Sequence, residues 1–152
     1  MISFIEEGVK SKLTNRRIIK KWISEVANSY GFNVGNLCYI FCDDEYILNV
    51  NREYLQHDYY TDIITFDYVT ENSVSGDMYI SVDTVLSNSK IYSSSYIIEL
   101  HRVIIHGVLH LCGLKDKTHD DELKMREAED KALLLLSRLI QQNHLGKPTN
   151  QN

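Results

Sequence analysis

The apolar residues of this chain recur in two spacings, one typical of strands and the other typical of helices. Short apolar runs predict strands at residues 2–6, 37–42, 63–69 and 78–82, with a turn at Ser73–Gly76 between the last two. Apolar residues three and four apart predict helices at residues 14–30, 43–54, 83–92, 95–112 and 120–143. We expect Thr14 or Asn15 to cap the first helix and Asp43 to begin the second.

The order of these elements predicts an α/β (α+β) fold in a single domain. Two early helical connections favour a partly parallel sheet, and the hairpin adds an antiparallel strand. The result is a small mixed sheet of about four strands packed with helices. We expect the domain to cover residues 1–143 and the polar residues 144–152 to form a disordered tail.

Length and composition are those of an ordinary globular domain. The 152 residues are 43% hydrophobic and 24% charged, which allows one domain with a sizeable core. The apolar runs are too short to span a bilayer, and the acidic start does not resemble a signal peptide, so we expect a cytoplasmic protein. The three cysteines include no Cys-x-x-Cys pair and are expected to be reduced thiols, with a catalytic thiol at Cys112 as the alternative.

The net charge of −5 argues against polyanion binding by the whole surface, but basic residues gather locally near the N-terminus. The cluster consists of Lys10, Lys12, Arg16, Arg17, Lys20 and Lys21. Because Arg16/Lys20 and Arg17/Lys21 are spaced four apart, these four side chains would form a stripe on a helix. The stripe is either the solvated face of an amphipathic helix or a local basic patch that could bind a polyanion.

The helix expected at residues 95–112 is apolar nearly all round, so its histidines must be satisfied inside the protein. His106 and His110 are four residues apart and can therefore aim their imidazoles at one point. Gly113 is a natural helix terminator, and the chain can then turn back and bring Asp116 to the same point. Two imidazoles and a carboxylate form the ligand set of a catalytic Zn²⁺. His101 lies about 140° round the helix and should stay outside the cluster.

The residues around this cluster narrow its chemistry. A zinc peptidase of the His-Glu-x-x-His type would carry its general base at position 107, which is a glycine here. We therefore expect hydrolysis by a metal-activated water, with Gly107 leaving room for a substrate to approach the helix. Thr61-Asp62 precedes a predicted strand, where the pair either stabilises a turn or orients the substrate. Arg52 could place its guanidinium toward a phosphate.

Three segments resemble the YbeY family: Thr61–Phe66, Gly76–Ser81 and the run His106-Gly107-Val108-Leu109-His110-Leu111-Cys112-Gly113. Members of this family are bacterial, zinc-dependent endoribonucleases. The resemblance implies one Zn²⁺ per chain at the C-terminal end of a buried helix and a water on that metal that attacks a phosphodiester. It further implies a single-stranded RNA substrate and roles in ribosomal RNA maturation, including the 3′ end of 16S RNA, and in ribosome quality control. Partners would then be ribosomal RNA and ribosomal proteins, with no membrane.

The chain departs from the family pattern at two positions. Where most members have a third histidine ligand, this chain has Asp116, with His119 three residues further on as the alternative ligand. The family also carries an arginine where Leu55 stands, and Arg52 or Arg102 could supply the positive charge instead. This second departure leaves an alternative function open, namely a non-catalytic ribosome-assembly or RNA-binding factor with a structural metal.

Overall fold

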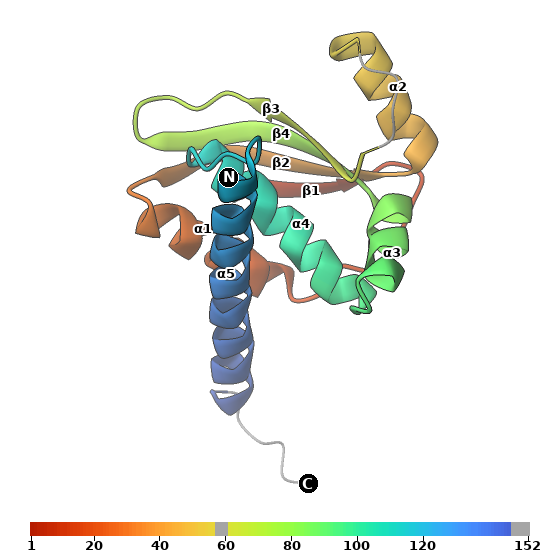
Figure 1. Cartoon of the computed structure of the whole chain (residues 1–152). Helices are drawn as coiled ribbons and strands as arrows, with labels where there is room; N and C mark the ends of the chain where they lie inside the picture. Colours follow the sequence, from red (N-terminus) through yellow and green to blue (C-terminus); the bar gives the residue numbers. More distant parts are fainter. Residues whose placement is uncertain (57–60, 147–152) are drawn as a thin grey trace, which may run out of the picture.

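The computed structural model describes residues 1–56 and 61–146. The strands are β1 (Ile2–Glu6), β2 (Asn33–Cys42), β3 (Ile63–Asp67) and β4 (Ser73–Ser81). The helices are α1 (Arg16–Ser29), α2 (Asp44–Tyr54), α3 (Val82–Ile91), α4 (Tyr96–Leu111) and α5 (His119–Leu145) (Figure 1).

The four strands form one mixed sheet in the order β1-β2-β4-β3. The β1–β2 and β2–β4 pairs are parallel, and the β3–β4 hairpin is antiparallel. The chain passes from β1 to β2 through α1, and from β2 to β4 through α2 and β3. The predicted single α+β domain with a partly parallel sheet is therefore confirmed.

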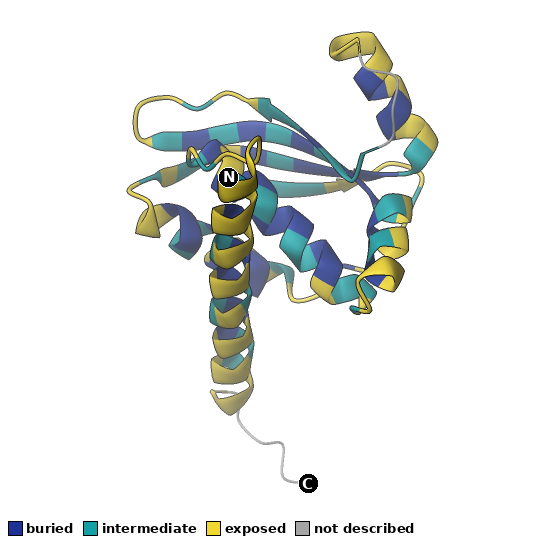
Figure 2. Cartoon of the chain, viewed as in Figure 1, coloured by how far each residue is buried: buried dark blue, intermediate teal, exposed yellow. Residues whose placement is uncertain are grey.

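The helices cover the two faces of the sheet unequally. α1, α4 and α5 pack on one face with the main core, whereas α2 lies on the other side over a small cluster around Ile47 and Ile64 (Figure 1). Figure 2 shows that α5 buries only one stripe of its length and leaves the rest exposed. Within the described residues, no helix is both long and apolar enough to cross a membrane.

The predicted turn at Ser73–Gly76 is wrong, because β4 already begins at Ser73. The chain turns earlier, where Thr70 and Ser73 bridge. Gly76 lies within the β3–β4 pairing and not in the turn. It allows the two strands to approach closely, because a Cβ at this position would lie 2.5 Å from the carbonyl oxygen of Phe66 on β3. A glycine read as a turn signal here marks a close approach of two strands.

The ends of three other elements also differ from the predictions. β2 begins at Asn33, earlier than expected, and β3 ends at Asp67, whose side chain accepts a hydrogen bond from the Val69 amide. Asn15 occupies the N-cap of α1 in a left-handed conformation, but its side chain makes no capping bond. α5 runs to Leu145, past the expected end of the domain, and the rest of the predicted disordered tail, from residue 147, lies outside the described residues.

Candidate metal centre

His106 and Asp116 face each other at the C-terminal end of α4. The Nε2 atom of His106 lies 3.4 Å from Oδ2 of Asp116. Two ligand atoms on one tetrahedral zinc ion, each about 2.1 Å from the metal, stand roughly 3.4 Å apart. The pair therefore has the spacing of two ligands that share an ion.

The turn after α4 creates this pairing. Gly113 adopts a φ of 102°, and the Leu114 amide donates to the carbonyl of Leu109, as in a Schellman cap. The chain therefore reverses at Gly113 and returns Asp116 toward the helix, as the sequence predicts for this glycine.

His106, His110 and Asp116 line one cavity of about 230 Å³. Thr61 and Asp62, at the entrance to β3, line the same cavity. Among the residues that the structure describes, no three His, Cys, Asp or Glu side chains converge tightly enough to hold an ion as they stand. His110 is exposed, so its imidazole is the ligand that has to turn toward the other two.

Glu129 supports His106 from the side away from Asp116, and the sequence patterns do not single this residue out. Glu129 lies on α5, is only 5% exposed, and its Oε2 is 2.7 Å from Nδ1 of His106. Because an ionised carboxylate only accepts, the Nδ1–H donates and the Nε2 lone pair of neutral His106 points toward Asp116. Arg102 holds the carboxylate in turn, with its Nη1 3.0 Å from Oε1 of Glu129.

This carboxylate–histidine pair is typical of metal sites, where the second ring nitrogen of a ligand is fixed by an acidic group. The signal in the sequence is a single glutamate on the apolar stripe of α5, between Met125 and Ala132, which are both buried. Such a buried carboxylate needs a partner, but the sequence does not say which residue provides it.

The acidic surroundings change the protonation of His106. Burial lowers the pKa of His106. The hydrogen bond to Glu129 and the charges of Glu129, Asp62 and Asp116 raise this pKa by more than burial lowers it, so the net shift is upward. The pKa of Asp62 is raised by burial, although the charge of His106 partly opposes that shift. A cation at this site would take the place of the proton on His106.

Two expectations about neighbouring residues need revision. Gly107 does not leave room for a substrate, because it faces the sheet: a Cβ there would lie 2.4 Å from the sulfur of Met78. His119 begins α5, is exposed and does not line the cavity that Asp116 enters. The geometry of the described residues therefore favours Asp116 over His119 as the third ligand.

Two arginines are candidates to replace the positive charge missing at Leu55, and Cys112 is a candidate nucleophile. Arg102 is bound by Glu129 and Asp130, and so its charge is already balanced. Leu55 is 39% exposed just after α2, and Arg52 lies in the last turn of that helix. Burial raises the pKa of Cys112 to about 11, which keeps its thiol protonated at neutral pH and disfavours a catalytic thiol.

The six residues of the N-terminal basic cluster do not all lie on one element. Lys10 and Lys12 precede α1, and the helix itself carries the other four cations. Arg16 pairs with Glu6 at 2.7 Å, and both Arg16 and Lys20 lie over the ring of Phe4.

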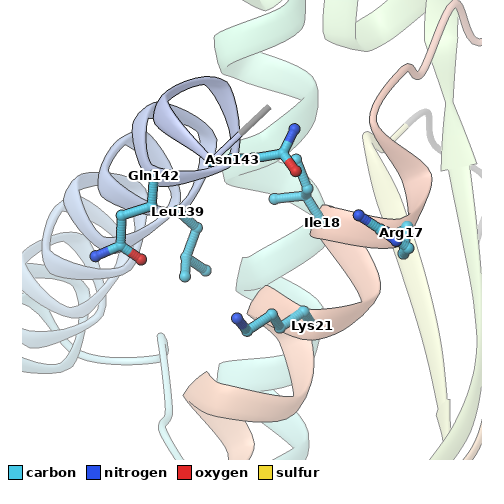
Figure 3. A pocket seen from close by; sticks show the side chains of 7 residues that line it. Arg17, Ile18, Lys21, Leu139, Gln142 and Asn143 are labelled. Carbon is cyan, nitrogen blue, oxygen red and sulfur yellow. The ribbon is translucent and has the colours of Figure 1, made fainter. Parts of the chain in front are cut away.

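Arg17 and Lys21 instead line a cavity of about 560 Å³ between α1 and the C-terminal end of α5 (Figure 3). Glu122, beside the candidate metal centre, and Gln142, in this cavity, are separated by roughly 30 Å along α5 at 1.5 Å per residue.

The protein is thus a small α+β domain with one mixed four-stranded sheet. Its candidate metal centre consists of the histidine pair on α4, with the buried Glu129 of α5 behind it. Residues 2–137 match the family described as Endoribonuclease YbeY. The chain belongs to that family.

Several curated relatives are similar along nearly the whole chain. An Endoribonuclease YbeY of Porphyromonas gingivalis is 58% identical over 139 residues, which are 91% of this chain and 92% of the relative. The Endoribonuclease YbeY of Phocaeicola vulgatus is 56% identical over 137 residues, covering 90% of this chain and 99% of the relative. A solution structure of a Thermotoga maritima protein superimposes with a TM-score of 0.66 at 22% identity, covering 100% of this chain and 99% of that one, and shows the fold alone.

Proposed function

We propose that this protein is a metal-dependent endoribonuclease that cuts single-stranded RNA in ribosomal RNA maturation, including that of the 3′ end of 16S RNA, and in ribosome quality control. Support comes from the family and from relatives that carry the name Endoribonuclease YbeY. The observation that carries the proposal is the His106–Asp116 pair backed by Glu129, because it provides a fixed nitrogen lone pair beside a carboxylate.

The ion would be Zn²⁺, one per chain, held by His106, His110 and Asp116. Bound there, it would lower the pKa of a coordinated water and polarise a phosphoryl oxygen. Asp116 in place of a third imidazole leaves the bound ion less positive, which favours a less acidic water.

The residues of the chain itself hold and orient the parts of this site. Glu129 fixes the ring of His106, and Arg102 fixes Glu129, so that the ligand atom is set before any ion arrives. Asp62 and Thr61 line the same cavity as the three candidate ligands, where they can orient a substrate. Position 107 carries no side chain, so a general base of the zinc-peptidase type is absent from α4.

The basic stripe would follow the backbone of a longer RNA. Arg17 and Lys21 face a broad cavity, whereas Arg16 is paired with Glu6, so Arg17 and Lys21 should contribute more to RNA affinity than Arg16 and Lys20. Arg52, in the last turn of α2, would add a further contact to RNA. The ribosome, its small-subunit proteins and the cytoplasm are the partners and compartment that this function implies.

The decisive test is RNA cleavage by the full chain with zinc restored after chelation. We expect the wild type to cut single-stranded RNA and to leave duplex RNA intact, and His110→Ala to abolish cleavage. His144→Ala, at the exposed end of α5, is the matched control and should cut normally. RNA left intact by the wild type and by His110→Ala alike would favour the alternative, a non-catalytic assembly factor with a structural metal.

The third ligand can be tested without measuring activity. We expect Asp116→Ala to lose bound zinc and His119→Ala to retain it, as measured by metal content after gel filtration. The reverse result would assign the position to His119.

A further inference from the structure

A second cavity lies directly beside the candidate metal centre. It has a volume of about 170 Å³ and shares Asp62 and His106 with the cavity that holds the candidate ligands. Its other walls come from α3, α4 and α5 and include Asn88, Glu99 and Arg126. The two cavities therefore adjoin at Asp62 and His106, so a substrate bound at His106 would lie next to this second cavity.

Glu99 is the unusual residue of this cavity. It is only 5% exposed, yet its carboxylate accepts no hydrogen bond from any residue that the structure describes. Within the same described part of the chain, no fully enclosed side-chain oxygen or nitrogen lacks a hydrogen-bond partner. It follows that the Glu99 oxygens open into the cavity, where a ligand can reach them.

The electrostatics leave this carboxylate in need of donors. Burial raises its pKa, and the charges of Arg102 and Arg126 only partly oppose that shift. The Arg102 guanidinium is already bound by Glu129 and Asp130. A ligand that donates N–H groups to Glu99 would replace the water that burial has removed, and such charge-assisted bonds are strong in a confined site.

The same features disfavour two simple ligands. A phosphate would face three carboxylates on the cavity walls, those of Glu99, Asp62 and Glu129, against two arginines, Arg102 and Arg126, of which Arg102 is already paired. A second cation is disfavoured because both oxygens of Glu129 are already bonded and two cationic side chains, Arg102 and Arg126, also line the cavity. A neutral, flat group rich in N–H donors remains.

We propose that this cavity receives one base of the RNA next to the bond that is cut, and that Glu99 selects guanine and disfavours uracil. The inference rests on the proposed function, because it takes single-stranded RNA as the substrate. Guanine presents two adjacent donors, N1–H and N2–H, to the two oxygens of a carboxylate. Uracil presents one donor between two carbonyl oxygens, which a carboxylate repels.

Tyr92 completes the subsite at the rim. Its ring is 59% exposed at the end of α3 and lines the same cavity. Aromatic rings at such positions stack on unpaired bases with little regard to base identity. Tyr92 should therefore add affinity for any base, and Glu99 should add the selection.

The test compares two short single-stranded RNAs of equal length, oligouridine and the same RNA with one central guanosine. Binding is measured by fluorescence anisotropy with the full chain in chelator, so that the RNA stays intact. We expect the guanosine to tighten binding about tenfold, since a good bidentate contact discriminates by 1–3 kcal/mol. Glu99→Gln should remove this preference, and Tyr92→Ala should weaken both RNAs equally. Glu127→Gln, an exposed glutamate on α5 outside the cavity, is the matched control.

Equal binding of both RNAs by the wild type, or a guanosine preference that survives Glu99→Gln in protein with unchanged thermal unfolding, would overturn the subsite. The zinc-loaded protein separates this failure from that of the proposed function. Cleavage without base preference would remove only the subsite, whereas absence of both binding and cleavage would remove both.

Discussion

Two histidines on α4, His101 and His106, lie five residues apart and have opposite surroundings. His101 packs edge-on against Trp22, with ring centroids 6.1 Å apart, and burial alone lowers its pKa to about 4. His106 is also partly buried, but it bonds to Glu129 and lies near Asp62 and Asp116, and its pKa is raised. One helix therefore holds a neutral packing histidine and a histidine whose surroundings favour a positive charge.

This difference shows that burial does not make a histidine functional. Both rings are removed from water to a similar degree, and the sign of the shift is set by the carboxylates that face one ring and not the other. Those carboxylates come from α5 and from the segments after α4 and before β3, all distant in sequence from His106 except Asp116.

The largest expected difference is in zinc affinity and RNA cleavage, when His106 and His101 are replaced by glutamine one at a time. We expect His106→Gln to reduce zinc affinity by more than about a hundredfold and to abolish RNA cleavage. Loss of a residue that only supports a metal ligand typically lowers metal affinity 10–100-fold, and loss of the ligand itself should cost more. His101→Gln should leave both unchanged. Competition with a chromophoric chelator gives the affinities, and similar losses in both variants would break the comparison.

A smaller effect concerns the pH dependence of stability. The unfolded pKa of His101 is near 6.5 and its folded pKa is about 4, so the unfolded chain takes up the proton first as the pH falls. The neutral histidine therefore contributes stability that is present above pH 6.5 and is lost progressively as the pH falls toward 4. The loss is on the order of 3 kcal/mol at most.

Urea unfolding of the wild type and of His101→Gln at a series of pH values isolates this contribution from that of the carboxylates. We expect the difference in unfolding free energy between the two proteins to shift against the wild type between pH 6.5 and 4. A constant difference would show that His101 titrates normally in the folded state.

The smallest effect should come from the support behind His106. Glu129→Gln should weaken zinc binding about 10–100-fold, because the amide is uncharged and its single oxygen cannot accept from both His106 and Arg102, as the two carboxylate oxygens do. Asp130→Asn is the matched control: it removes the other carboxylate on Arg102 and leaves the bond to His106 in place. Equal zinc affinities in the wild type and Glu129→Gln would reduce Glu129 to a packing role.

The sequence predicts the local parts of this molecule well. The helix over residues 95–112, the stop at Gly113 and the return of Asp116 depend on nearby residues, and the structure has all three. The order of strands and helices likewise predicts the mixed sheet.

Contacts between distant segments could not be predicted from the same patterns. Glu129 lies 23 positions from His106, so their bond depends on how α5 packs across α4. Gly76 and Gly107 follow the same rule, because each is small for the sake of a neighbour on another element, Phe66 and Met78 respectively. Local patterns identify a glycine but not the atom that requires it.

If RNA contacts both the candidate metal centre and the Arg17–Lys21 cavity, as proposed, the length of α5 sets a minimum for the length of that RNA. The helix separates the candidate metal centre from the Arg17–Lys21 cavity by roughly 30 Å. A stacked strand advances about 3.4 Å per nucleotide, so about nine nucleotides are needed to bridge the two. α5 would thus act as a molecular ruler: shorter fragments would bind at one end only, and charge reversal at Arg17 and Lys21 would weaken long substrates while leaving short ones unaffected.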